Sequence, residues 1–216
     1  MPPPDAATLK AHHRRVRDGQ SQHDSTRLHR AISWLARSEQ ERDDLDARFI
    51  FQWVALNAAY ACEFHDGDTE RERFRGFIDT LVALDRGNAL HTTLFSTFSG
   101  PIRTLIDNKY VFGPFWAALR DHDASERWQQ AFSASKRAAL TAIMGNQTGT
   151  VLSIVFDRLY VLRNQLIHGG ATWNSQVNRN QLRDAVAILD TLVPQVVQIM
   201  LENPDHDFGE IQYPVT

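Results

Sequence analysis

Three polar residues lie at the end of one apolar segment: Arg163, Asn164 and His168, the last followed by two glycines. On an ideal helix of roughly 100° per residue, Arg163 falls about 40° from Leu159, inside the stripe that should be buried. That stripe consists of apolar residues at helical spacing: Leu152, Val155, Phe156, Leu159, Leu162 and Leu166. Asn164 and His168 are four residues apart and share a polar strip with Asp157. Because an unpaired buried cation is very costly, the arrangement indicates a cleft or subunit seam where Arg163 meets an anion.

Each of these residues also has a purely structural explanation. Arg163 would be satisfied by a carboxylate on a neighbouring helix, such as Asp43, Asp44 or Asp46. His168, in the last turn, would cap helix carbonyls and interact with the negative end of the helix dipole. The joint presence of an Arg-Asn pair and a histidine at the helix end favours a functional site.

Other patterns lack the spacing that their chemistry needs. The histidines near the N-terminus fit no tight set of metal ligands: His12, His13, His23 and His29. Asp66, Asp68 and Glu70 resemble the start of a calcium loop, but its twelfth position is Phe77 instead of a glutamate. No glycine-rich phosphate loop is present, which argues against a P-loop or Rossmann nucleotide site. We therefore expect neither a metal nor a cofactor.

Composition and charge are those of a soluble globular protein. The 216 residues are 43% hydrophobic and 23% charged, which excludes a disordered or collagen-like chain. A single cysteine, Cys62, and the absence of a signal-like N-terminus predict a cytoplasmic protein with no membrane partner. The net charge is -3, but residues 1–30 carry six cations and three anions. A basic arm on an acidic body is expected to touch nucleic acid only locally.

Helical spacing of apolar residues recurs almost to the C-terminus. The patterns predict helices beginning near residues 24 and 43, one ending near Gly87, and helices over 125–144, 150–168 and 178–203, the last bent at Pro194. Residues 88–122 should form short helices, although residues 92–98 have a β-favouring composition. These patterns predict an all-α, antiparallel multi-helix bundle: a flexible basic arm over residues 1–23 and a single domain over 24–216.

Two segments carry a resemblance to a known family. The pattern Arg163-Asn164-x-x-x-His168 resembles the signature of HEPN domains, in which an arginine, usually followed by a polar residue, precedes a histidine by four to six positions. The continuation to Trp173 is similar to Apea-like and related prokaryotic HEPN proteins. The aromatic-rich segment 48–60, with its Trp and Asn, is similar to their early helix. Together the two segments span the core of residues ~45 to 200.

The resemblance implies a metal-independent endoribonuclease that works as a homodimer, with the motifs of two subunits facing each other. The 2'-OH of RNA would attack the adjacent phosphate. His168 would serve as general base or acid, Arg163 would hold the phosphate oxygens, and Asn164 would orient His168 or bind the phosphate. The resemblance also implies a toxin or defence effector, with an antitoxin protein or a nucleotidyltransferase as partner. A catalytically inactive HEPN-like module that binds RNA or a protein partner is the alternative.

Overall fold

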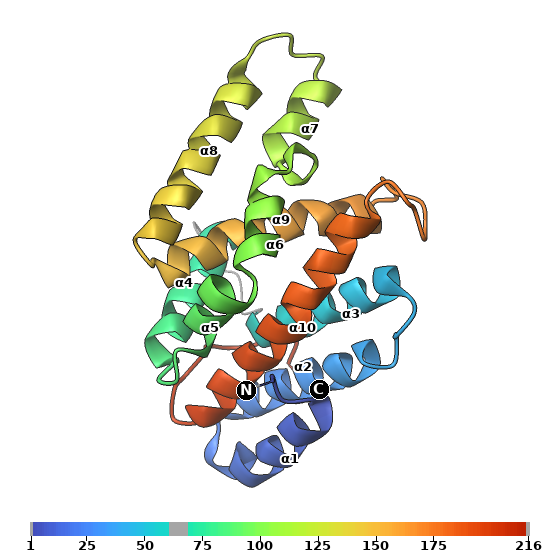
Figure 1. Cartoon of the computed structure of the whole chain (residues 1–216). Helices are drawn as coiled ribbons and strands as arrows, with labels where there is room; N and C mark the ends of the chain where they lie inside the picture. Colours follow the sequence, from blue (N-terminus) through green and yellow to red (C-terminus); the bar gives the residue numbers. More distant parts are fainter. Residues whose placement is uncertain (1, 61–68, 215–216) are drawn as a thin grey trace. The chain divides into compact units, whose positions relative to one another are not determined.

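The computed structural model describes residues 2–60 and 69–214, so Cys62, Asp66 and Asp68 lie outside the described residues. Within the two ranges every regular element is a helix, which confirms the predicted all-α class. In chain order (Figure 1) the helices are α1 (Ala6–Val16), α2 (Gln22–Ser38), α3 (Leu45–Tyr60), α4 (Glu70–Leu84), α5 (Ala89–Thr92), α6 (Ser99–Asp107), α7 (Gly113–Arg120), α8 (Arg127–Met144), α9 (Thr148–Ile167) and α10 (Arg179–Glu202). Single turns connect some of them: η1 (Arg17–Gly19), η2 (Thr93–Thr97) and η3 (Lys109–Val111).

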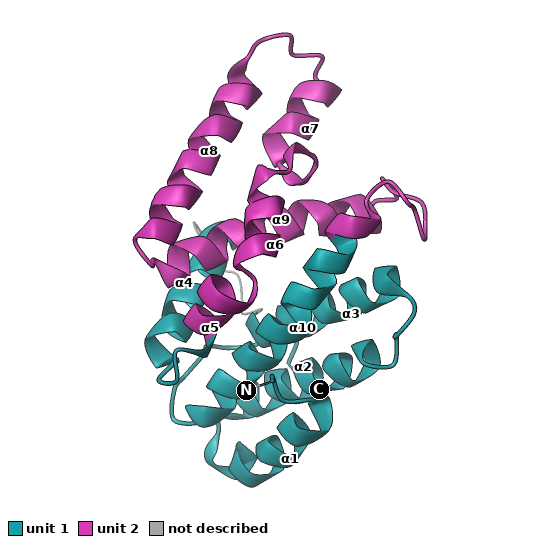
Figure 2. Cartoon of the chain, viewed as in Figure 1, with its two compact units in different colours: residues 1–89, 182–216 teal, residues 90–181 magenta. Residues whose placement is uncertain are grey.

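The chain divides into two compact units, shown in different colours in Figure 2, where the sequence predicts one domain over residues 24–216. The first unit contains residues 1–89 and 182–216, and the second contains residues 90–181. Both crossings between the units fall at helices, α5 and α10, and neither falls in a linker rich in glycine or proline. Composition therefore gives no signal of the division.

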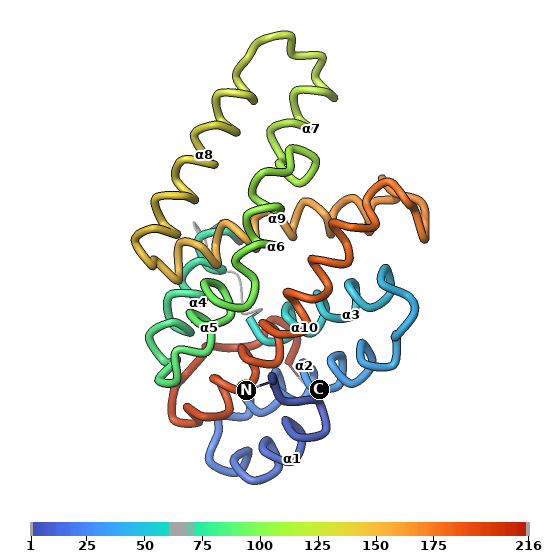
Figure 3. Tube along the Cα trace, viewed as in Figure 1, coloured from blue at the N-terminus to red at the C-terminus, as the bar shows by residue number. Residues whose placement is uncertain are grey.

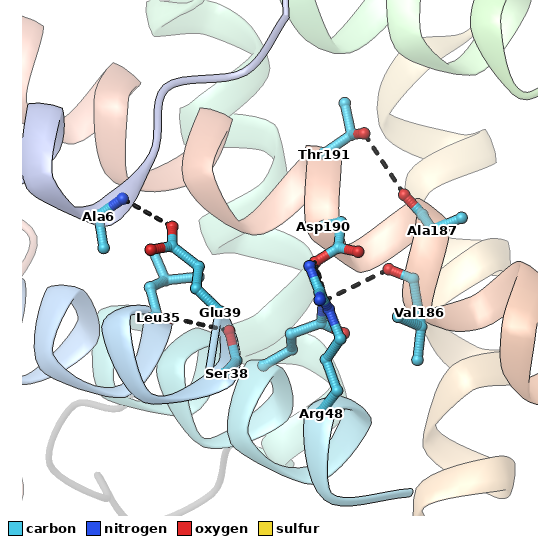
Figure 4. A network of polar contacts seen from close by, with 10 residues as sticks. Ala6, Leu35, Ser38, Glu39, Arg48, Val186, Ala187, Asp190 and Thr191 are labelled. Atoms are coloured by element: carbon cyan, nitrogen blue, oxygen red, sulfur yellow. Dashed lines mark hydrogen bonds and ion pairs between the residues drawn. The ribbon is translucent and has the colours of Figure 1, made fainter. Parts of the chain in front are cut away.

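The N-terminal residues form a packed helix where the sequence predicts a flexible arm over residues 1–23. Ala6, Leu9 and His13 of α1 are buried, and α1 contacts α2 in the same unit. The backbone N–H of Ala6 donates a hydrogen bond to Glu39 at 2.7 Å, which joins the two helices (Figure 4). Residues 6–16 are therefore a packed helix and not a flexible arm. The few buried side chains of α1 recur at helical spacing and pack against α2, although most of the other residues of α1 are polar.

The core of the first unit contains a fully buried arginine. Arg27 of α2 donates hydrogen bonds to the backbone carbonyls of Ala59 and Gly209. Its guanidinium also forms an ion pair with Asp24 at 3.3 Å, and both side chains are almost completely removed from solvent. This arginine therefore ties α2 to the end of α3 and to the C-terminal segment.

The second unit contains helices α6 to α9, and α8 packs on both α7 and α9 (Figure 3). Helix α8 ends at Gly145, as the sequence predicts. Residues 93–97, whose composition favours a strand, form one turn of wider π-type helix, because no partner strand exists within the described residues.

Helix α10 is long and apolar enough to cross a bilayer, but most of its apolar segment is buried within the protein. Such burial is typical of a core helix in a soluble protein. Pro194 lies inside this helix and is buried.

Candidate functional site at the end of helix α9

The end of α9 is fixed by the two glycines that follow it. The backbone N–H of His168 donates to the carbonyl of Asn164 at 3.0 Å, and Gly169 has a φ of +68°, the left-handed conformation that ends many helices. A Cβ on Gly170 would lie 3.2 Å from the backbone oxygen of Gln165, so this close approach also favours glycine. The predicted helix end is thus confirmed, with His168 directly after the last helical residue.

Arg163 is half-buried in the structure, whereas the sequence predicts that it lies inside the buried stripe. Its Nη1 donates a hydrogen bond to Asn164 Oδ1 at 2.9 Å, and its guanidinium lies 5.8 Å from the ring centre of Tyr160. Its Nε is buried and has no hydrogen-bond partner. Within residues 90–181 no carboxylate forms an ion pair with Arg163, so its own unit supplies no salt bridge. Asp43, Asp44 and Asp46, the carboxylates considered from the sequence, belong to the other unit.

The structure brings Arg163 and Asn164 together but does not link the side chain of His168 to either. The imidazole of His168 is exposed and makes no hydrogen bond within the described part of the chain. The predicted relation between Asn164 and His168 exists only through the backbone hydrogen bond. An imidazole in this position is accessible to a ligand or to a second subunit.

Two apolar side chains share the exposed face of α9 with this polar group. Tyr160 is 40% exposed and Ile167 is 46% exposed. These two residues are seven positions apart and point in directions only about 20° apart at roughly 100° per residue. Arg163 and Asn164 lie between them along the helix, within about 60° of Tyr160 on the same scale. A face that mixes exposed apolar groups with an arginine resembles the composition of protein interfaces.

The arginine that is actually buried in α9 is Arg158, which the sequence analysis did not single out. Its guanidinium lies 4.5 Å from the ring centre of Phe112 and 5.5 Å from that of Phe132. It donates a hydrogen bond to Ser135 at 3.1 Å and a longer one to the carbonyl of Ile106 at 3.5 Å. All of these partners belong to residues 90–181, so Arg158 holds α6, α8 and α9 together.

Burial lowers the pKa of Arg158 from its ordinary value to about 10, and the neighbouring charge of Asp157 opposes that change. A helical wheel with one apolar stripe places Arg158 about 100° from Leu159, outside that stripe. The wheel fails here because both α6 and α8 contact α9 and cover more than one stripe of it. The sequence signal that was available is the pair of aromatic residues, Phe112 and Phe132, but their proximity to Arg158 requires the fold.

Charge is divided between the two units. Residues 90–181 contain nine Lys and Arg against five Asp and Glu, a net charge of +4, whereas the other unit carries -7. Several cations of the basic unit are exposed: Arg103, Lys109, Arg120, Arg127 and Arg137. The unit that contains Arg163 and His168 is therefore the basic one, although the sequence assigns the local positive charge to residues 1–30.

The second segment of the family resemblance, residues 48–60, lies in the other unit. Arg48 donates two hydrogen bonds to Asp190, at 3.0 and 2.7 Å, and the fully buried Gln52 donates to the same carboxylate and to the carbonyl of Val186 (Figure 4). This cluster joins α3 to α10, and Asp190 neutralises the charge of Arg48. We interpret it as a structural element of the first unit.

Among the described residues, no three His, Cys, Asp or Glu side chains gather as metal ligands. Of the N-terminal histidines, His13 lies 3.2 Å from Ser25 Oγ, and its ring centre is 6.5 Å from that of His29. His23 Nδ1 accepts a hydrogen bond from the backbone of Ile211 at 3.3 Å. These contacts are structural.

Comparison of the chain with protein-family models, curated proteins and solved structures gives no match. The HEPN resemblance therefore depends on the quoted residues alone.

Proposed function

We propose that this protein is a metal-independent endoribonuclease of the HEPN type that acts as a homodimer. The observation that carries the proposal is the set of partners around Arg163. This arginine has no carboxylate partner in its basic unit, it bonds Asn164, and the exposed His168 follows at the end of the same helix. A guanidinium in this state suits a phosphate, which it binds through paired charge-assisted hydrogen bonds.

In the proposed reaction, the 2'-OH of a ribose attacks the adjacent phosphorus and the 5'-oxygen of the next nucleotide leaves. His168 of one subunit removes the proton from the 2'-OH. His168 of the second subunit supplies a proton to the leaving oxygen, because an imidazole exchanges protons near neutral pH. Arg163 stabilises the negative charge of the pentacoordinate transition state. The products are a 2',3'-cyclic phosphate and a free 5'-OH.

The dimer is proposed to form through the exposed face of α9. Tyr160 and Ile167 on that face would be buried against a second copy, which would bring two sets of Arg163, Asn164 and His168 together. One subunit contains one such histidine, so the general acid and the general base come from different subunits. An antitoxin protein or a nucleotidyltransferase is the class of regulatory partner proposed for a cytoplasmic toxin or defence effector of this kind.

A specific observation favours a second candidate, an inactive helical module that binds RNA or a protein partner. No hydrogen bond within the described residues orients the imidazole of His168, whereas general acid–base catalysis needs a positioned ring. A module that only binds RNA needs Arg163 and the basic unit but makes no demand on the orientation of His168.

Incubation of the purified chain with mixed RNA in EDTA separates the two candidates. The endoribonuclease produces fragments with 2',3'-cyclic phosphate ends, and His168→Ala abolishes them. His122→Asn is the matched control, because it removes another exposed imidazole of the same unit at a φ of +51°, which asparagine tolerates. Intact RNA with the wild-type chain, or equal cleavage by His168→Ala, rejects the proposed activity.

A further inference from the structure

A group of aromatic side chains beside the end of α9 is only partly covered by protein. Tyr110 is 51% exposed and Trp116 is 38% exposed. Phe115 contacts both rings edge to face, its ring centre 5.5 Å from that of Tyr110 and 5.1 Å from that of Trp116. Trp128 of α8 also packs on Phe115, with 5.1 Å between their ring centres. Packing between helices explains Phe115 and Trp128, but it does not explain why the two outer rings face solvent.

Hydrogen bonds fix the backbone of Tyr110 and the indole of Trp116 relative to α9. The carbonyl oxygen of Tyr110 accepts a hydrogen bond from the indole Nε1 of Trp116 at 2.8 Å. The same oxygen accepts a second from the side-chain amide of Gln165 at 2.7 Å. Gln165 is a neighbour of His168 on the helix surface because the two are three positions apart, whereas Arg163 points about 160° away from Gln165. The indole of Trp116 and the backbone of Tyr110 are therefore anchored within one turn of His168.

A cation accompanies the rings. Lys109 Nζ lies 5.2 Å from the ring centre of Tyr110 and 5.4 Å from that of Phe115, and the side chain of Lys109 is exposed. Exposed aromatic faces next to a lysine are the arrangement by which proteins bind single-stranded nucleic acids, since bases stack on the rings and cations contact the phosphates. The net charge of +4 in this unit agrees with a polyanionic ligand.

We propose that Tyr110 and Trp116 form a stacking platform for unpaired RNA bases beside His168, at the end of α9. The inference deepens the proposed function, because it takes the ligand to be RNA and adds that the strand is single. Bases in a duplex are stacked on one another and hidden from the platform, so the site selects loops and unpaired ends. Stacking does not read hydrogen-bonding edges, and the selection among the four bases is expected to be weak.

The test measures the fluorescence anisotropy of labelled U10 RNA bound to the full chain carrying His168→Ala, in EDTA at fixed salt. Without His168 the RNA stays intact during the titration. Tyr110→Ala and Trp116→Ala should each raise the Kd roughly tenfold, the scale of losing one base stack. Tyr110→Phe, which keeps the ring, should bind like the parent. Trp34→Ala is the matched control, because Trp34 is 39% exposed and also stacks on an aromatic ring, but lies in the acidic unit.

An abasic strand of the same length and charge distinguishes stacking from backbone contact. Binding of that strand should be unchanged by Tyr110→Ala and Trp116→Ala. Quenching of tryptophan fluorescence by U10 should be lost in Trp116→Phe and kept in Trp34→Phe. Both variants keep an aromatic ring for packing, so this measurement tests the platform without removing a ring. Unchanged U10 affinity in both alanine variants, equal weakening toward the abasic strand, or no binding of U10 by the parent overturns the platform. A chain that binds U10 through these rings but leaves RNA intact when His168 is present refutes the nuclease and leaves the platform standing.

Discussion

Arg27 and Asp24 form an ion pair that is almost entirely removed from solvent, with side-chain exposures of 0% and 3%. Asp24→Ala is expected to leave the guanidinium buried without its carboxylate, at a cost of roughly 3–5 kcal/mol in the free energy of unfolding. Urea unfolding of the full chain measures this change. The exposed pair of Arg17 and Asp18 is the control, because Asp18→Ala should cost less than ~1 kcal/mol. Equal effects of the two substitutions would contradict the role assigned to the buried pair.

Arg163→Ala should separate stability from activity. Since no carboxylate of its own unit is left unpaired, we expect the free energy of unfolding to change by less than ~1 kcal/mol. RNA cleavage should fall at least ~100-fold, as for other groups that stabilise transition-state charge. Thermal melts and cleavage assays of the same preparations measure the two quantities.

Arg158→Ala provides the contrast within the same helix. It removes a side chain packed against Phe112 and Phe132, and the cavity should cost about 2 kcal/mol or more. A large loss of stability in Arg163→Ala, equal to that in Arg158→Ala, would show that Arg163 is a structural residue.

Ile167→Glu should dissociate the proposed dimer. The substitution places a charge on the apolar part of the exposed α9 face, where a second copy would bury it without a partner. Light scattering at micromolar concentration should give the mass of two chains for the wild type and of one chain for the variant. Leu140→Glu is the control, because Leu140 is exposed to a similar degree, 49%, on α8. A monomeric wild type would exclude a catalytic site shared between two copies at that concentration.

The buried His13 is expected to make the first unit sensitive to acid. Burial lowers the pKa of His13 below 6.5, with help from the nearby charges of His29 and Arg17. The unfolded chain then binds a proton more readily than the folded chain. The contribution of neutral His13 to the free energy of unfolding is therefore fully present above about pH 6.5, and it is lost as the pH falls from there toward the folded-state pKa. Melting temperatures at pH 7.5, 6.5 and 5.5 should show this loss, and His13→Gln should reduce it; an identical profile in both chains would assign the acid sensitivity to other groups.

The sequence predicts the end of α9 well and its surroundings less well. The two glycines and the apolar stripe are local signals, and helix end and stripe are both found. The depth of Arg163 and the burial of Arg158 depend on which helices cover α9, and a wheel drawn for one partner cannot contain that information. Helix α1 was missed for a related reason: its few apolar side chains are too sparse to predict a helix until α2 is present to cover them.

The division of charge illustrates a second limit of sequence reasoning. Counting along the chain places the positive charge at residues 1–30, whereas the compact unit with net charge +4 is found only when the fold groups residues 90–181. The Tyr110 and Trp116 cluster was missed in the same way, because η3, α7 and α9 must be assembled before the exposed rings adjoin Gln165.

The second unit is inserted in the sequence of the first, between residues 89 and 182, and this order has a consequence during synthesis on the ribosome. The first 89 residues emerge without α10, whose buried side chains and Asp190 complete their core. Residues 90–181 are contiguous and need no later segment of the chain to form their own contacts. The second unit is thus able to fold while the first unit still exposes apolar surface, so a chain that stops before α10 is expected to aggregate through residues 1–89.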